Sequence, residues 1–209
     1  MCRRVDRPFA RAVAYGSYEG ALRELIHLLK YNGVRPAANV LAGLLAEAFN
    51  ALESSFKQDA VLIVPVPLYK SKQRQRGFNQ AELVASAALK VASGRFLMAP
   101  GILQRVRDTH SQIGLTSHQR RENMRGAFAV AADLTGREII LVDDVYTTGT
   151  TATECARVLV RAGAARVWVA TVARTLKLAS NEQGFQVPEM QAPPEDAQPA
   201  ETLEPVGKQ

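Results

Sequence analysis

The sequence has few of the features that mark secreted or membrane proteins. Its 209 residues include only two cysteines, Cys2 and Cys155, which are too few for a disulfide framework. No apolar run approaches the roughly 18 residues that a membrane helix needs. No apolar segment of a secretory signal follows the basic N-terminal residues. We therefore expect a soluble cytoplasmic protein that does not contact a membrane.

Common phosphate and metal motifs are also missing. The sequence contains neither G-x-x-x-x-G-K-[ST] nor G-x-G-x-x-G, which argues against a P-loop enzyme and a Rossmann dinucleotide site. Its histidines, His27, His110 and His118, show no metal-ligand spacing, so we expect no zinc. Aromatic residues make up 6% of the chain, and no stripe of them indicates a surface for stacking single-stranded DNA.

Acidic residues are concentrated at the C-terminal end of a basic chain. The formal net charge is +6, but residues 178–209 hold six acids against Lys208, so residues 1–177 carry +11. A basic body suits a polyanionic ligand, although basic surfaces also aid solubility. The segment 178–209 contains five of the ten prolines and one aromatic residue, Phe185. We expect this tail to be disordered and the folded domain to span residues 1–177.

Helical patterns recur along the folded part. Apolar spacing from Leu22 predicts a helix that ends at Asn32-Gly33, where Tyr31 is expected to be a packing residue. Pro36 suits the start of a second helix, and Asn79 can cap a third whose inner face includes Val91. A fourth helix is expected to stop near residue 163, where the sequence has a glycine.

Continuous apolar runs alternate with these helices and predict buried strands, at residues 60–67, 138–142 and 166–173. Short links between helices and strands favour right-handed crossovers. The sequence therefore predicts an α/β fold with a parallel sheet and helices on both faces. Residues 104–126 show neither the helical nor the strand repeat of apolar residues, and they are polar and rich in arginine. We therefore expect a long functional loop there, or else a solvated insertion.

The stretch "IILVDDVYTTGTT" (139–151) carries the main candidate site. It ends a buried strand with Asp143 and Asp144, at the sheet edge where parallel sheets bind ligands. Adjacent carboxylates repel each other unless sugar hydroxyls or a metal stabilise them. Gly149 permits a sharp turn, and free N–H groups at the next helix favour a phosphate. We predict neighbouring pockets for vicinal hydroxyls and a phosphate, because a solvated acidic turn with a helix cap explains neither the paired aspartates nor four threonines.

This stretch resembles the phosphoribosyl pyrophosphate (PRPP) motif of type I phosphoribosyltransferases. The resemblance implies that fold with a small N-terminal hood, drawn from residues 10–35, and a reaction in which a nitrogen nucleophile displaces pyrophosphate from ribose C1. It implies Mg²⁺ held through PRPP near the two aspartates, with no direct protein ligand. The resemblance also implies that Asp143 and Asp144 are catalytic residues. The implied PRPP-binding residues are Asp143, Asp144, Val145, Tyr146, Thr147, Thr148, Gly149, Thr150 and Thr151.

One position departs from the 6-oxopurine members of that superfamily. Those enzymes have an aspartate where this chain has Thr147, and the aspartate acts as the base toward the purine. Thr147 cannot accept a proton in that way. A hypoxanthine or guanine salvage enzyme is therefore not expected.

Further segments resemble the ComF branch of competence-related proteins. They are "YEGALRELIHLLKYNG" (18–33), "VPVPLYKSKQRQRGFNQAELVA" (64–85) and "LQRVRDTHSQIGLTSHQRRENMRGAF" (103–128). The resemblance implies a pyrophosphate loop that comprises Val66, Pro67, Leu68, Arg74 and Arg76. It implies a flexible lid that includes Arg105, Arg107, Gln112, Arg120 and Arg121. Many relatives carry a four-cysteine zinc module at the N-terminus, which we do not expect here; Cys2 could be the last cysteine of such a module, lost by truncation or by a misplaced start.

The sequence leaves two candidate functions, and a third is less favoured. The first is a PRPP-dependent transferase with an unknown nitrogen acceptor. The second is a non-catalytic PRPP-binding or DNA-uptake accessory protein, for which single-stranded DNA or competence proteins are expected partners. A plain basic nucleic-acid module explains the charge but leaves the paired aspartates unexplained. A homodimer is possible in each case.

Overall fold

The computed structural model describes residues 7–92, 95–109, 116–176 and 185–186. Its main sheet has the strand order β3-β2-β6-β7-β1-β8, and each strand runs parallel to its neighbours. The strands of this sheet are β1 (Arg11–Ser17), β2 (Val61–Pro65), β3 (Phe96–Met98), β6 (Glu138–Tyr146), β7 (Arg166–Arg174) and β8 (Phe185–Gln186). An antiparallel pair, β4 (Leu103–Arg105) and β5 (Phe128–Val130), forms a second small sheet.

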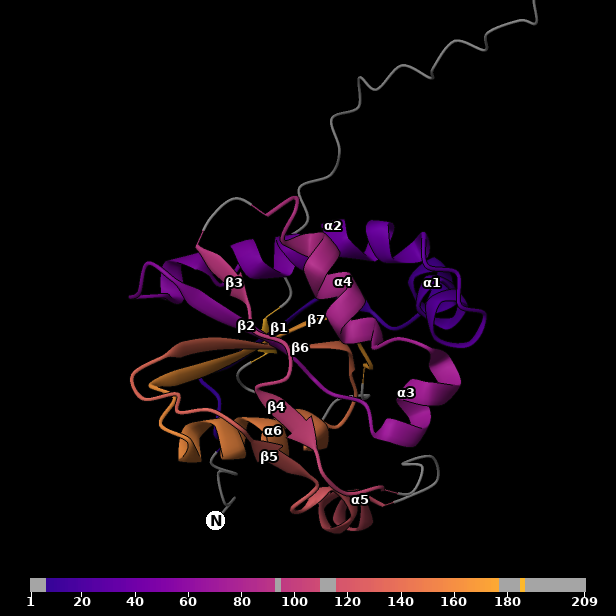
Figure 1. Cartoon of the computed structure of the whole chain (residues 1–209). Coiled ribbons are helices and arrows are strands. Elements are labelled where there is room, and N and C mark those ends of the chain that lie inside the picture. Colours follow the sequence, from indigo (N-terminus) through magenta and orange to yellow (C-terminus); the bar gives the residue numbers. More distant parts are fainter. Residues whose placement is uncertain (1–6, 93–94, 110–115, 177–184, 187–209) are drawn as a thin grey trace, which may run out of the picture.

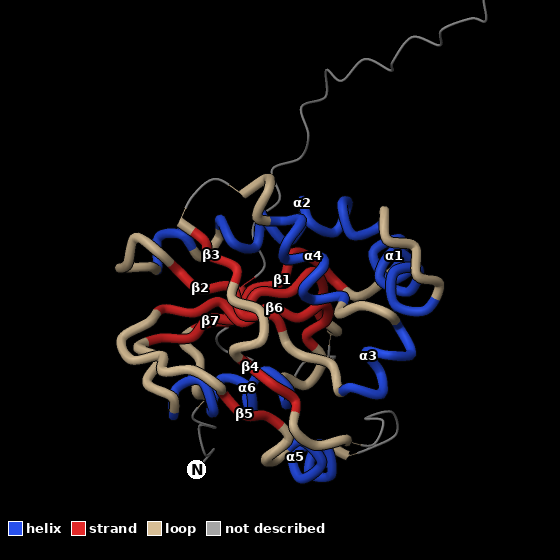
Figure 2. Tube along the Cα trace, viewed as in Figure 1, coloured by secondary structure: helices blue, strands red, loops and turns tan. Residues whose placement is uncertain are grey.

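Helices cover both faces of the main sheet (Figures 1 and 2). They are α1 (Gly20–Tyr31), α2 (Ala37–Asn50), α3 (Lys70–Arg76), α4 (Gln80–Ala88), α5 (Ser117–Met124) and α6 (Thr150–Arg161), with a short 3₁₀ turn at Glu53–Ser55. Helices α1, α2 and α4 lie on one side of the sheet in Figure 1, and α6 lies on the other side with the β4–β5 pair. This arrangement confirms the predicted parallel α/β sandwich.

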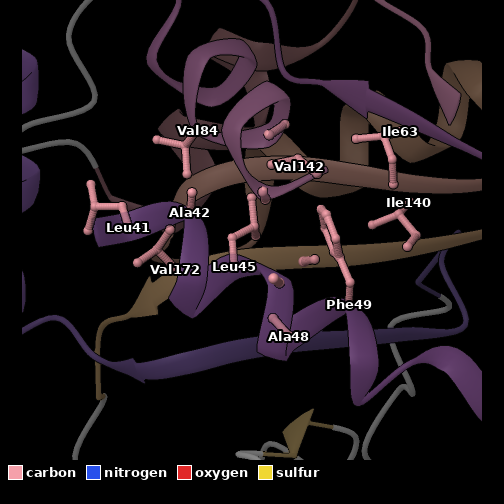
Figure 3. Close-up of a cluster of buried hydrophobic side chains, with 14 of the residues drawn as sticks. Leu41, Ala42, Leu45, Ala48, Phe49, Ile63, Val84, Ile140, Val142 and Val172 are labelled. Atoms are coloured by element: carbon pink, nitrogen blue, oxygen red, sulfur yellow. The ribbon is translucent and has the colours of Figure 1, made fainter. Parts of the chain in front are cut away.

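Each face of the sheet has its own apolar core. On one side, Leu41, Leu45 and Phe49 of α2 share a core with Ile63 of β2 and Ile140 of β6, and all five are fully buried (Figure 3). Burying a leucine or phenylalanine contributes roughly 1.5–3 kcal/mol, so this layer is a major source of stability. The other core joins alternate residues of β6 and β7 to α6 and to the ends of the β4–β5 pair.

The helix starts and stops follow the sequence pattern closely. Asn32 ends α1, with Gly33 at φ +65°, and Asn79 caps α4 by accepting a hydrogen bond from the Ala81 N–H at 3.1 Å. Val91, however, was expected on the inner face of α4 and is 65% exposed. The helix ends at Ala88, because the following N–H groups turn back to nearer carbonyls in a tighter, 3₁₀-like turn.

Part of the segment 10–35, which was expected to supply the hood, lies elsewhere in the fold. Residues 11–17 form β1 inside the main sheet, paired with β7, so they do not belong to a separate hood. Helix α1 remains the part of 10–35 that lies beside the candidate site. In the tail, Phe185–Gln186 pair with Ala12 and Val13 of β1, and the other residues predicted to be disordered lie outside the described ranges. Within those ranges, no helix combines the length and apolarity needed to cross a membrane.

Candidate functional site

The end of β6 places its two adjacent aspartates in different surroundings. Successive side chains of a strand point to opposite faces of the sheet. Asp143 therefore lies toward α6, where it lines a small cavity together with Thr147, Gly149 and Thr151. Asp144 lies toward the other layer and reaches Lys30 in the last turn of α1. The two carboxylates thus belong to the two layers of the sandwich.

Asp144 and Lys30 form a largely buried ion pair. Only 6% of the aspartate side chain and 18% of the lysine side chain are exposed. Burial acts to raise the pKa of Asp144, but the Lys30 ammonium outweighs it and leaves that pKa below its usual value. Burial likewise acts to lower the pKa of Lys30, and the Asp144 carboxylate outweighs it, so both groups are charged at neutral pH.

Asp143 is half-buried and forms no ion pair of this kind with a described residue. Its Oδ1 accepts a hydrogen bond from the Asp144 backbone N–H at 2.9 Å. Burial raises the pKa of Asp143 well above its ordinary value, and the neighbouring Asp144 carboxylate raises it further. A group in this state is a good hydrogen-bond partner for a hydroxyl, because it can accept when ionised and donate when protonated.

The threonine turn connects β6 to α6 through Gly149. Gly149 has φ +73° and packs against the ring of Tyr146, which is buried on the α6 side. The hydroxyls of Thr148 and Thr150 lie 2.9 Å apart, and Thr147 is exposed at the surface of the turn. The cavity behind the turn has a volume of about 20 Å³, the room of one water molecule, so a phosphate fits only on the open side.

A basic recess lies on the other side of the paired acids. It occupies about 460 Å³ between the C-terminal end of α1 and α3, and is lined by Lys30, Tyr31, Asn32, Gly33, Lys72, Gln75 and Arg76. Three of these residues are cationic and none is acidic. The Arg76 guanidinium lies 5.8 Å from the centroid of the Tyr31 ring. Tyr31 is 67% exposed, so the expectation that it is a packing residue was wrong.

The predicted pyrophosphate loop divides between two places. Val66 is buried, and its carbonyl accepts a hydrogen bond from the Asn79 side chain at 3.0 Å. Pro67 and Leu68 line a second cavity of about 440 Å³. Arg74 and Arg76 follow on α3 rather than in a loop, and of these two only Arg76 faces the basic recess. Arg74 is exposed and lines none of the cavities described here.

The predicted lid begins and ends on well-packed residues. Leu103, Met124 and Phe128 are buried in the core beside α6. Arg105 lines the 440 Å³ cavity and donates a hydrogen bond to the Thr109 hydroxyl. Burial lowers the pKa of Arg105.

The other residues of the predicted lid contact the backbone, lie on α5 or fall outside the described residues. Arg107 donates to the carbonyls of Asn123 and Arg125 at 2.9 and 2.7 Å, which satisfies backbone groups at the end of α5. Arg120 and Arg121 lie on α5, and Gln112 lies outside the described residues. Movement of this segment over a ligand stays a prediction.

Two functional candidates, Lys30 and Lys72, were missed by sequence reasoning. Lys30 stands four residues after the buried Ile26, so it continues the apolar stripe of α1. A charged residue in such a stripe indicates a buried partner, and this signal was available in the sequence. Lys72 gave no comparable signal, because its position depends on how α3 packs beside α1.

Comparison with known proteins first identifies the class of domain to which this chain is similar. Residues 83–190 match the family model of the phosphoribosyl transferase domain, a range that contains the end of β6, the threonine turn and α6. A hypoxanthine-guanine phosphoribosyltransferase of Bacillus anthracis aligns with 71% of this chain and 80% of its own, at 14% identity and a TM-score of 0.44.

Curated relatives then narrow the class. DNA utilization protein YhgH of Escherichia coli K12 is 34% identical over 176 residues, which cover 84% of this chain and 77% of the relative. Competence protein F of Haemophilus influenzae is 32% identical over 180 residues, covering 83% and 76%. Competence protein ComFC of Bacillus subtilis is 25% identical over 150 residues, covering 71% and 58%. The chain belongs to the ComF family of competence-related proteins with a phosphoribosyltransferase-like fold.

Proposed function

We propose that this protein binds PRPP with Mg²⁺ and transfers the phosphoribosyl group to a nitrogen nucleophile. The observation that carries the proposal is the junction of β6 and α6, where Asp143 and the threonine turn share one small cavity. A ribose 5-phosphate has hydroxyls and a phosphate ester at neighbouring positions. The phosphate would lie on the open side of Thr147–Thr151, where N–H groups at the start of α6 favour an anion.

The pyrophosphate would lie in the basic recess. Lys72 and Arg76 supply positive charge there, and the described lining contains no acid that would repel it. Within the described residues, no three His, Cys, Asp or Glu side chains come together to hold a metal. The ion would arrive with PRPP and be held through the oxygens of PRPP, near Asp143 and Asp144, whose negative charge favours a cation there. Such an ion would neutralise part of the pyrophosphate charge.

The proposed reaction exchanges one bond at ribose C1. The C1–O bond to pyrophosphate breaks with its electron pair on the leaving oxygen, and C1 takes on oxocarbenium character. A nitrogen lone pair then forms the C1–N bond, and the nitrogen releases a proton. Asp143 would hold the ribose hydroxyls through these steps, which fixes C1 in the direction of the nucleophile. Thr147 cannot serve as the base, so the acceptor nitrogen is expected to lose its proton to water or to the leaving group.

Calorimetry with PRPP and Mg²⁺ tests the proposal directly. The native protein should bind PRPP, and a variant with Asp143→Asn and Asp144→Asn should lose at least 10-fold in affinity, since it removes the carboxylate that would hold the ribose hydroxyls and the adjacent carboxylate that pairs with Lys30. Asp59→Asn, at an exposed position away from the site, is the matched control and should bind like the native protein. No heat of binding from the folded native protein would refute the proposal.

The accessory function has one structural observation in its favour. The rings of His27 and Tyr31 lie 4.5 Å apart on the exposed face of α1, and Arg76 lies beside Tyr31. Such a group can stack on bases of single-stranded DNA, and the names of the relatives refer to DNA utilization and competence. Gel-shift assays with DNA at increasing salt concentrations distinguish the accessory function from the transferase function. Salt-sensitive DNA binding without pyrophosphate release from PRPP across an acceptor screen would favour the accessory function.

A further inference from the structure

Lys30 lies between two parts of the proposed site. Its ammonium pairs with Asp144 at the end of β6, and the same side chain lines the basic recess that also contains Lys72 and Arg76. With 18% of its side chain exposed, Lys30 is not sealed from the recess. Of the described residues that line the recess, Lys30 is the one that forms an ion pair with an aspartate of the motif.

The chemistry of an ammonium allows both contacts at once. Lysine carries three N–H donors, and an ion pair with one carboxylate oxygen can be made with one of them. The remaining donors can reach a second anion without breaking the first pair. Lys72 and Arg76 are placed to attract a pyrophosphate, but in the described structure neither forms an ion pair with Asp143 or Asp144. The connection between the sugar end and the pyrophosphate end therefore depends on Lys30.

A purely structural role explains this pair less well. Desolvating two charges costs several kcal/mol, and apolar residues of similar size often stabilise such a position equally well. Neighbouring positions of α1 show that alternative, because Ile26 and Leu29 are both almost fully buried. Lys30 instead carries a charge at a position where α1 reaches both Asp144 and the basic recess.

We propose that Lys30 is a positioning residue that holds Asp144 and at the same time donates to the pyrophosphate group of the ligand. This inference rests on the proposed function and names the side chain that links its two halves. Lys30 orients the carboxylate on the sugar side. On the other side it adds positive charge next to the bond that breaks, so charge that develops on the leaving group is met by a fixed donor.

The test compares ligands and variants by calorimetry at fixed ionic strength. The ligands are inorganic pyrophosphate without Mg²⁺, so that loss of the Asp144 charge does not act through a metal ion, and, separately, ribose 5-phosphate. The decisive pair of variants is Asp144→Asn and the double variant Lys30→Met with Asp144→Asn. The double variant removes both charges together, so it avoids the uncompensated buried carboxylate that Lys30→Met alone would leave. Circular dichroism and urea unfolding confirm that both are folded.

We expect Asp144→Asn to bind pyrophosphate at least as tightly as the native protein, because the ammonium is released from its carboxylate. The double variant should bind pyrophosphate at least 10-fold more weakly than Asp144→Asn. The variant Lys30→Arg with Asp144→Asn should recover most of this loss, which a purely structural role would not produce. Lys90→Gln, an exposed lysine outside the recess, should leave the affinity unchanged.

Two results would overturn the inference. One is equal pyrophosphate affinity in Asp144→Asn and the double variant, and the other is no pyrophosphate binding by the native protein. The proposed function fails on a different result, namely that the native protein does not bind PRPP in the presence of Mg²⁺. Separate titrations with pyrophosphate and with PRPP therefore distinguish the two failures.

Discussion

Replacing Gly149 by alanine tests whether the threonine turn depends on one backbone position. Gly149 has φ +73°, where an L-residue with a Cβ is strained by about 1 kcal/mol. A Cβ here would also meet the Tyr146 hydroxyl and lie 2.6 Å from Cζ of that ring. Tyr146 is buried, so the ring cannot swing out, and overpacking of this kind costs about 1–3 kcal/mol more. We expect Gly149→Ala to destabilise the fold by about 2–4 kcal/mol.

Gly136 provides a matched control for the backbone contribution. It has φ +74°, but a Cβ built there meets no atom within 4 Å. Gly136→Ala should therefore lose only the backbone part, about 1 kcal/mol. Urea unfolding of the two variants measures the difference, and a double-mutant cycle with Tyr146→Phe reports how much of it involves the hydroxyl. Equal losses at Gly149 and Gly136 would refute the packing argument, and with it the view that Tyr146 shapes the turn.

Three further perturbations follow from single side chains. Burial is the main cause of the raised pKa of Asp143, so above about pH 4 the folded state keeps a proton that the unfolded chain has released. The free energy of unfolding should therefore fall as pH rises from about 4. Urea titrations at several pH values should show that Asp143→Asn flattens this fall. Asn79→Ala should cost about 2 kcal/mol in urea unfolding, since it removes the α4 cap and the donor to Val66, whereas Asn79→Asp should recover only the cap. Cys155 is fully buried and burial raises the pKa of its thiol, so mass spectrometry should find this residue alkylated by iodoacetamide in urea and protected in the native protein.

Sequence periodicity was sufficient for the long elements and insufficient for the short ones. Strands β2, β6 and β7 are continuous apolar runs, and α1 and α2 repeat apolar residues at helical spacing, so each could be predicted from local pattern alone. Strands β3, β4 and β5 have three residues each, too few to establish a period. They form by pairing with segments distant in the chain, β3 with β2 and β4 with β5, and no local window of sequence contains that information.

The candidate site shows the same division between local and long-range information. The motif at Asp143–Thr151 is contiguous, so its turn and helix start could be predicted from the sequence. The basic recess combines α1 with α3, whose residues are about 40 positions apart in the chain, and its existence depends on the packing of both helices near the end of β6. Charge counting predicted a basic body, but it could not separate Arg76, which faces the recess, from Arg74, which does not.

The alternation along β6 gives a reason for two adjacent acids rather than one. Leu141 joins the core beside α6 and Val142 joins the core beside α2, so Asp143 and Asp144 continue the same alternation into the two layers. A single aspartate could face the threonine turn or Lys30, but not both. The Asp144 N–H to Asp143 Oδ1 hydrogen bond then couples the two carboxylates through the backbone. A ligand that contacts both the turn and the recess would thus be held from both layers of the sandwich, with the strand end between them as the fixed point.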